Sequence, residues 1–208
     1  MNINEILSNK DLFEIGIRNK TDKTHSGGAI NSYLRVMEFY FKHLRDEEIK
    51  ILEIGVRTGN SVKTWKEYFT KAKIYGIDID DCTKYTDDRI KIFQGDQKDI
   101  KVLNTVSQEV DYFDIIIDDG SHVNTDIKES YNFLINKLRP KGIYIIEDLS
   151  NSYPYRTCGE NKIHGNERKT LQVLFDSIVF SMDKSTWTGN NEFVGLHFWP
   201  GMCVIIKN

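Results

Sequence analysis

The chain has 208 residues, with 28 basic and 31 acidic side chains and a formal net charge of −3. It contains no block of like charge, so we expect no nucleic-acid partner. Its three cysteines are widely separated and odd in number, which fits neither a disulfide framework nor a zinc site. The N-terminus does not resemble a signal peptide, and no apolar run reaches membrane-spanning length. We therefore expect one soluble, cytoplasmic α/β domain without a membrane partner.

The first part of the chain is predicted to be helical. We expect residues 1–45 to form a helical segment with a lid loop, and residues 46–208 to form the main domain, as a single folding unit. The polar loop from Thr21 to Gly28 could be a lid over a site or merely a connection. Apolar residues at helical spacing between Tyr33 and Leu44 predict a helix that packs on the sheet.

Short apolar runs bounded by polar residues predict strands that are buried on both faces. These runs lie at residues 50–54, 74–77, 90–93, 115–117 and 143–146. Their alternation with helices predicts a mostly parallel, Rossmann-like sheet with helices on both faces. Two last runs, at residues 193–199 and 202–206, are joined by Pro200-Gly201 and predict a C-terminal antiparallel hairpin.

Helical spacing also appears after several of these strands. One such stretch runs from Ile127 to Leu138, and Pro140 with Gly142 should end it. A polar stretch from Ser150 to Gly165 is long enough to predict a loop beside a substrate. Its Tyr153 and Tyr155 could shape an acceptor pocket or simply cover the sheet.

A glycine-rich turn follows the first strand of the main domain. Glu53-x-Gly55-x-x-x-Gly59 leads into a helix, and glycines let a backbone approach a ligand closely at a helix N-terminus. The spacing is not the dinucleotide fingerprint, although an ordinary nucleotide binder stays open as an alternative. Asp78 ends the next strand, where an acid can accept hydrogen bonds from a ribose diol. After the third strand, the side chains of Gln94-Gly95-Asp96-Gln97 could pair with the edge of an adenine.

Acidic residues gather at the carboxyl ends of two further strands, the edge where such sheets bind ligands. One strand ends in Asp118-Asp119-Gly120-Ser121-His122, and a later strand ends in Glu147 and Asp148. Carboxylate oxygens suit a hard cation such as magnesium and argue against zinc. Asp118 and Asp119 should point to opposite sides of an extended strand, so we expect one of them as a ligand. Acids at strand ends can alternatively cap the following helix.

Together these motifs resemble the class I S-adenosylmethionine-dependent methyltransferases. With Gly95-Asp96-Gln97 and Ile146-Glu147-Asp148-Leu149, they resemble more narrowly the metal-dependent sugar O-methyltransferases of the macrocin and mycinamicin type. The elements Thr21-Asp22-Lys23 and His197-Phe198-Trp199 are also similar to that family. The resemblance covers residues 20–208. We expect the chain to lack the family's large N-terminal oligomerisation domain, so neither the quaternary structure nor the acceptor carries over from the resemblance, and homo-oligomer formation stays open.

The resemblance implies a site for each component of the reaction. S-adenosylmethionine would be bound by residues of the turns after the strands: Glu53, Gly55, Thr58, Gly59, Ser61, Asp78, Asp96, Gln97 and Asp118. A divalent metal, Mg²⁺ or Mn²⁺, would be bound by Asp119, Glu147 and Asp148. His122 would be the general base, and Asp119 would take part in catalysis through the metal.

The leading hypothesis for the acceptor is a sugar hydroxyl, within a nucleotide sugar or a glycosylated small molecule. A bound metal would lower the pKa of that hydroxyl, and an imidazole with an ordinary pKa of about 6.5 would take its proton. Two alternatives are a metal-dependent methyltransferase of a catechol-like diol and a non-catalytic S-adenosylmethionine-binding partner protein. The other histidines, which are His25, His43, His164 and His197, are expected to be structural or solvated.

Overall fold

The computed structural model describes residues 4, 8, 10–26, 32–149, 167–188 and 192–208. The predicted loop from Ser150 to Gly165, with Tyr153, Tyr155 and His164, lies outside the described residues. Within them the strands are β1 (Lys50–Ile54), β2 (Lys73–Asp78), β3 (Ile90–Gln94), β4 (Phe113–Asp118), β5 (Leu138–Ile146), β6 (Phe193–Trp199) and β7 (Met202–Lys207). The α-helices are α2 (Asp11–Asn19), α3 (Tyr33–Phe41), α4 (Asn60–Tyr68), α5 (Ile100–Glu109), α6 (Asn124–Leu134) and α7 (Glu167–Thr188).

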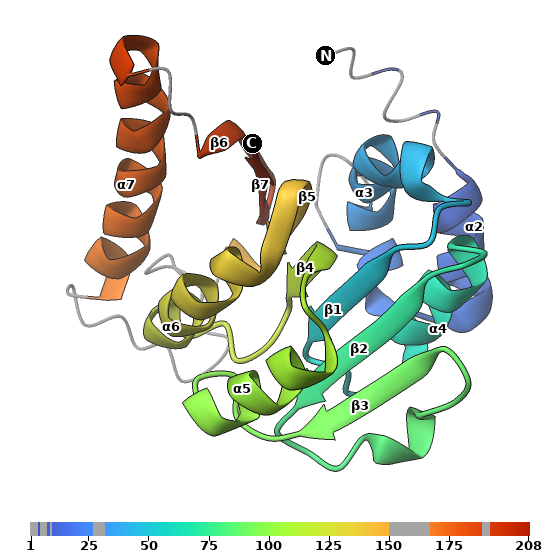
Figure 1. The fold of residues 1–208 in the computed structure, drawn as a ribbon. Coiled ribbons are helices and arrows are strands. Elements are labelled where there is room, and N and C mark those ends of the chain that lie inside the picture. The colour runs from blue at the N-terminus through green and yellow to red at the C-terminus, as the bar shows by residue number, and fades with distance from the viewer. Residues whose placement is uncertain (1–3, 5–7, 9, 27–31, 150–166, 189–191) are drawn as a thin grey trace.

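The seven strands form one sheet in the order β3-β2-β1-β4-β5-β7-β6 (Figure 1). Strands β1 to β5 pair in parallel, whereas β7 pairs antiparallel with both β5 and β6. The predicted mostly parallel sheet and its C-terminal hairpin are therefore confirmed. The order reverses between β1 and β4, and ligands bind at such switch points in open α/β sheets.

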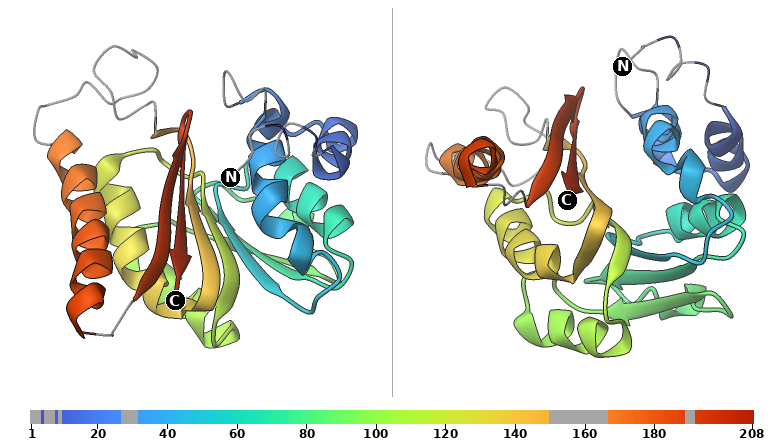
Figure 2. Two further views of the ribbon diagram at one scale, coloured as in Figure 1. Left: turned by 90° about the horizontal axis from the view of Figure 1, so that it is seen from above. Right: turned by 45° about the horizontal axis from the view of Figure 1, so that its top comes forward.

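Helices cover both faces of the sheet, as the two views of Figure 2 show. On one face, α2, α3 and α4 pack Leu12, Met37 and Trp65 against alternate strand residues such as Ile51. On the other face, α5, α6 and α7 pack against the intervening positions such as Leu52. This alternation follows from the two-residue period of a strand and explains why the strands are apolar throughout.

Two elements differ from the sequence prediction. Helix α6 ends at Leu134, and after a short 3-10 turn Leu138 begins β5 instead of ending the helix. Pro140 is tolerated in β5 because it lies where the register between β4 and β5 shifts, between the pairs Phe113–Leu138 and Ile115–Ile143. Helix α5 was not predicted, although Asp99 caps it by accepting a hydrogen bond from the backbone N–H of Lys101 at 2.8 Å.

The helices in the described part of the chain include none that is both long enough and apolar enough to cross a membrane.

Candidate active site

A cavity of about 900 Å³ lies at the carboxyl ends of β1 to β5. Its walls come from the turns that follow these strands, among them Gly55, Asp78, Gln97, Asp119 and Asp148. The strands thus bring together residues that are far apart in sequence, as the parallel topology predicts. The volume is within the range typical of small-molecule sites.

The glycine turn after β1 forms one wall of this cavity. Gly55 has φ +91°, and a Cβ at this position would lie 2.1 Å from the carbonyl oxygen of Asp119. Only glycine therefore allows the β1 and β4 turns to approach so closely. Thr58 and Ser61 also line the cavity, and Gly59 caps helix α4 with φ +72°. The turn exposes backbone to the cavity, as expected for a ligand-binding turn.

Asp78 joins the turns that follow β1 and β2. Its Oδ2 accepts a hydrogen bond from the backbone N–H of Arg57 at 2.6 Å, and its Oδ1 accepts one from Asp80 at 2.9 Å. The side chain lines the cavity and is 9% exposed. The predicted ribose-binding acid is therefore fixed in place at the cavity wall.

Asp96 and Gln97 line the cavity after β3, whereas Asp118 lies behind it. Gln97 donates from Nε2 to Asp118 Oδ1 at 3.2 Å and accepts from the backbone N–H of Ser121 at 2.7 Å. Ser130 donates a second hydrogen bond to Asp118 at 2.7 Å. Burial raises the pKa of Asp118 to about 6, against these hydrogen bonds, which lower it. The structure thus gives Asp118 a supporting position beneath Gln97.

Glu53 is fully buried beneath the glycine turn and does not line the cavity. Its Oε2 accepts hydrogen bonds from Ser61 Oγ at 2.8 Å and from Trp65 Nε1 at 3.0 Å. Burial raises its pKa to about 7, although the nearby ammonium of Lys23 opposes the shift. Glu53 therefore anchors the start of helix α4 to the end of β1.

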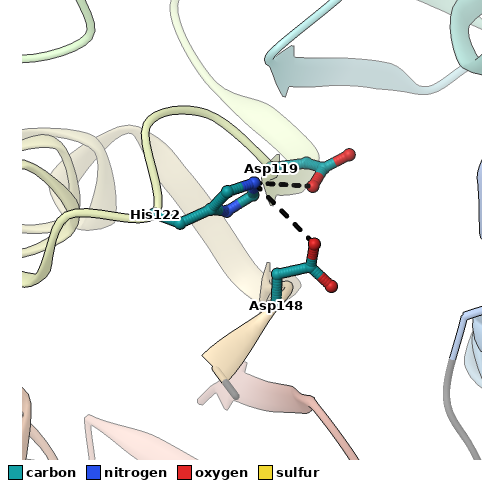
Figure 3. A group of neighbouring side chains, drawn as sticks. All are labelled: Asp119, His122 and Asp148. Atoms are coloured by element: carbon teal, nitrogen blue, oxygen red, sulfur yellow. Dashed lines mark ion pairs between the residues drawn. The ribbon is translucent and has the colours of Figure 1, made fainter. Parts of the chain in front are cut away.

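Asp119, His122 and Asp148 converge at the cavity (Figure 3). The Nε2 atom of His122 lies 3.9 Å from Asp119 Oδ1 and 3.8 Å from Asp148 Oδ2. One donor atom from each residue lies within 4.8 Å of the others, a spacing that a single metal ion can bridge. His122 and Asp148 have φ +57° and +53°. Such backbone costs on the order of 1 to 3 kcal/mol per residue and is concentrated at functional sites.

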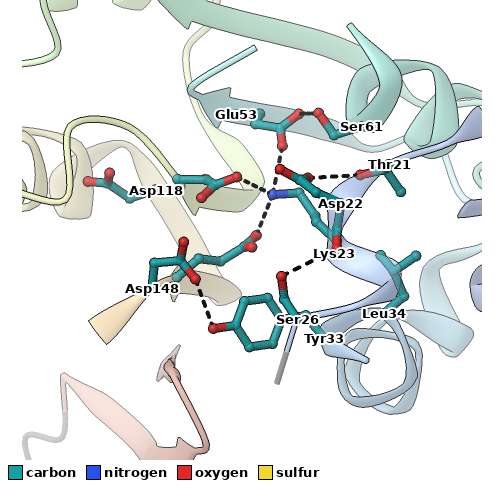
Figure 4. Close-up of polar contacts among 12 residues, drawn as sticks. Thr21, Asp22, Lys23, Ser26, Tyr33, Leu34, Glu53, Ser61, Asp118 and Asp148 are labelled. Carbon is teal, nitrogen blue, oxygen red and sulfur yellow. Dashed lines mark hydrogen bonds and ion pairs between the residues drawn. The ribbon is translucent and has the colours of Figure 1, made fainter. Parts of the chain in front are cut away.

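Lys23 is a site residue to which the sequence analysis gave no role. Its ammonium is buried and lies 2.5 Å from Asp119 Oδ2, 2.8 Å from Glu147 Oε1 and 3.4 Å from Glu53 Oε1 (Figure 4). Burial disfavours the charged lysine, but the three carboxylates outweigh it and raise the pKa of Lys23 well above its usual value. The pairing of Lys23 with these carboxylates could not be predicted from the sequence, because its partners are distant along the chain.

Glu147 faces Lys23 and does not belong to the group formed by Asp119, His122 and Asp148. Burial, reinforced by repulsion from Asp119, raises the pKa of Glu147 well above its usual value. The prediction that Glu147 binds metal therefore stays a prediction. Asp119 and Asp148 do converge, and so does the predicted base His122.

The sheet order, the glycine turn at the switch point and the acid at the end of β2 define the fold of class I S-adenosylmethionine-dependent methyltransferases. Comparison with known proteins finds relatives of the chain among the O-methyltransferases. It is 31% identical to mycinamicin VI 2''-O-methyltransferase of Micromonospora griseorubida, over 95% of this chain and 52% of the relative. It is 32% identical to demethylmacrocin O-methyltransferase of Streptomyces fradiae, over 95% of this chain and 53% of the relative.

A solved structure gives the same relationship. The MycE methyltransferase from the mycinamycin biosynthetic pathway, in complex with Mg, SAH and mycinamycin VI, matches with a TM-score of 0.80 and 30% identity over 97% of this chain and 55% of that chain. No protein-family model matches the sequence. The chain is therefore a homologue of the macrocin- and mycinamicin-type sugar O-methyltransferases, and it spans about half the length of the relatives it matches. The resemblance stated from the motifs is confirmed.

Proposed function

We propose that the chain is an S-adenosylmethionine-dependent and divalent-metal-dependent O-methyltransferase that acts on a sugar hydroxyl. The observation that carries this proposal is the convergence of Asp119, His122 and Asp148 on the cavity that is also lined by Gly55 and Asp78. The proposed base, the acidic metal ligands and the glycine turn that would bind the cosubstrate therefore all line one cavity. The names of the homologous enzymes support the same chemistry.

S-adenosylmethionine would lie along the turns after β1, β2 and β3. Gly55 and Thr58 offer close backbone contact to its methionine part, and Asp78 can accept hydrogen bonds from its ribose hydroxyls. Asp96 and Gln97 would face its adenine. The MycE structure, which contains the demethylated product SAH, supports this assignment for a homologous fold.

The donor set fits a hard divalent cation such as Mg²⁺ or Mn²⁺. Asp119 and Asp148 each present a carboxylate oxygen to the same point beside His122. Glu147 would be a third carboxylate ligand. When bound, the ion would supply Lewis acidity, which lowers the pKa of an acceptor hydroxyl.

His122 would take the proton of the acceptor hydroxyl. The hydroxyl oxygen then forms a bond to the methyl carbon while the bond from that carbon to the sulfonium sulfur breaks, giving a methyl ether and S-adenosylhomocysteine. The side chain of His122 is 26% exposed, so it can pass the proton on to solvent. We propose a nucleotide sugar or a glycosylated small molecule as the acceptor, because one homologue is named for a rhamnosyl tetracenomycin.

The proposal is tested by incubating the protein with S-adenosylmethionine, Mg²⁺ and a panel of acceptors, followed by mass spectrometry. The panel contains glycosylated macrolides, nucleotide sugars and catechols. A gain of one methyl group on a sugar supports the proposal. Transfer to catechols alone would make the chain a diol methyltransferase of another kind. Binding of S-adenosylhomocysteine without transfer to any acceptor would indicate a non-catalytic binding protein.

A further inference from the structure

Asp119 and Asp148 of the proposed metal site each have one oxygen that faces His122 and one that is held from behind. In Asp119, Oδ1 faces His122, whereas Oδ2 pairs with the ammonium of Lys23 at 2.5 Å. In Asp148, Oδ2 faces His122, whereas Oδ1 accepts a hydrogen bond from the hydroxyl of Tyr33 at 3.0 Å. Figure 4 shows the hydroxyl of Tyr33 reaching Asp148 and the side chain of Lys23 extending from the N-terminal segment.

We infer that Tyr33 and Lys23 are positioning residues, which fix the rotation of Asp148 and Asp119 so that their remaining oxygens converge on one cation beside His122. The inference rests on the proposed function, because it assigns roles at the proposed metal site. A carboxylate that is free to rotate would offer either oxygen in many directions. Partners behind metal ligands remove that freedom, and their loss typically weakens metal binding or activity about 10- to 100-fold.

The Tyr33 hydroxyl has little freedom to leave Asp148. The side chain is 3% exposed, and a Cβ at position 201 would lie 2.2 Å from the hydroxyl oxygen, so Gly201 leaves just enough room for it. The carbonyl oxygen of Gly201 accepts a hydrogen bond from the backbone N–H of Leu149 at 2.9 Å. The turn between β6 and β7 therefore holds both the tyrosine and the residue after Asp148.

Lys23 and Tyr33 are also joined to each other through Ser32. The hydroxyl of Ser32 donates to the carbonyl oxygen of Lys23 at 2.9 Å and accepts from the backbone N–H of Leu34 at 3.1 Å. Ser32 thus caps helix α3 and fixes the main chain of the lysine in one arrangement. The two positioning residues form one unit, which contacts both metal-site acids.

The test measures Mn²⁺ binding by calorimetry in the wild type and in Tyr33→Phe, which removes only the hydroxyl. We expect Tyr33→Phe to bind Mn²⁺ about 10- to 100-fold more weakly, with S-adenosylhomocysteine affinity and thermal midpoint unchanged. Tyr40→Phe is the matched control. It removes a hydroxyl from the same helix, and that hydroxyl lies 2.7 Å from His197 Nδ1 instead of at the cavity. It should bind Mn²⁺ like the wild type.

A Tyr33→Phe protein with wild-type Mn²⁺ affinity would overturn the role of Tyr33 and leave the proposed function standing. A parallel loss of S-adenosylhomocysteine affinity and thermal stability would also overturn it, because the hydroxyl would then support the fold as a whole. A wild-type protein that binds no Mn²⁺ would contradict the metal site itself, and with it both the inference and the metal-dependent function.

Lys23→Met tests the second positioning residue, because it keeps the length of the side chain and removes the ammonium. We expect weaker Mn²⁺ binding, since Asp119 Oδ2 loses its partner. Tighter binding would mean that Lys23 competes with the ion for Asp119, and this result would overturn its assignment as a positioning residue.

Discussion

The ammonium nitrogen of Lys23 lies 2.5 Å from Oδ2 of Asp119, although 96 positions separate the two residues in the sequence. The lysine precedes the first strand of the sheet, and the aspartate follows the fourth. The described part of the N-terminal segment therefore forms a wall of the candidate site. The chemistry of the sheet edge depends on residues that come before the glycine turn.

The first prediction concerns binding of S-adenosylhomocysteine without metal. Asp78→Ala should weaken this binding by about 1 to 3 kcal/mol, because buried hydrogen bonds to the ribose are lost. Calorimetry measures the change. Asp81→Ala is the control, since Asp81 is an exposed acid in the same loop that does not line the cavity. Equal affinity of Asp78→Ala and the wild type would remove Asp78 from the binding site.

The sheet could be predicted because each of its strands is marked by residues that are neighbours in the sequence. Each strand is a short apolar run, and parallel pairing then places Asp78, Asp119 and Asp148 at one edge whatever the details of packing. The helix end near Leu138 was missed because the apolar spacing continues through a residue that pairs with Phe113 in the sheet. Spacing alone does not separate the last turn of a helix from the first residue of a strand.

The orientation of the acids could not be predicted from the sequence. Glu147 and Asp148 are adjacent, yet Glu147 turns toward Lys23 and Asp148 toward His122. Which acid meets which partner depends on the N-terminal segment, whose contacts to β4 and β5 span about half of the chain. The positive φ of His122 and Asp148 is likewise set by tertiary packing, because neither residue type requires it.

A second prediction concerns the stability of the protein at mildly acidic pH. Burial raises the pKa of Asp118 to about 6, whereas an aspartate in an unfolded chain titrates near 3.9. Between these values the folded protein keeps a proton that the unfolded chain releases, so this group makes the free energy of unfolding fall as pH rises from about 4 to about 6.

Asp118→Asn removes this contribution, so its free energy of unfolding should fall less over the same pH range. Urea unfolding at several pH values measures the difference. Glu53 and Glu147 remain in the variant, which isolates Asp118 from the other buried acids. Asp111 is exposed, so the free energy of unfolding of Asp111→Asn should change with pH in the same way as that of the wild type. Parallel curves for Asp118→Asn and the wild type would show that the proton is not held by Asp118.

A third prediction separates proton removal from metal binding. If His122 is the base, His122→Ala should lose about 10²- to 10⁴-fold in kcat and keep its affinity for S-adenosylhomocysteine and Mn²⁺. His43→Ala, an exposed histidine, is the control.

Loss of Mn²⁺ binding in His122→Ala would contradict this prediction. It would make the histidine a metal ligand, which its distances of 3.8 and 3.9 Å to the two acids also allow. A nearly wild-type kcat would mean that solvent takes the proton.

The most direct test of the central claim is the metal dependence of methyl transfer to a sugar acceptor. Protein treated with excess chelator should transfer no methyl group from S-adenosylmethionine, and added Mg²⁺ or Mn²⁺ should restore the rate, because carboxylate oxygens accept either ion. Asp119→Asn should need much more metal for the same rate. Full activity in excess chelator would contradict the account and would make Asp119 and Asp148 structural acids.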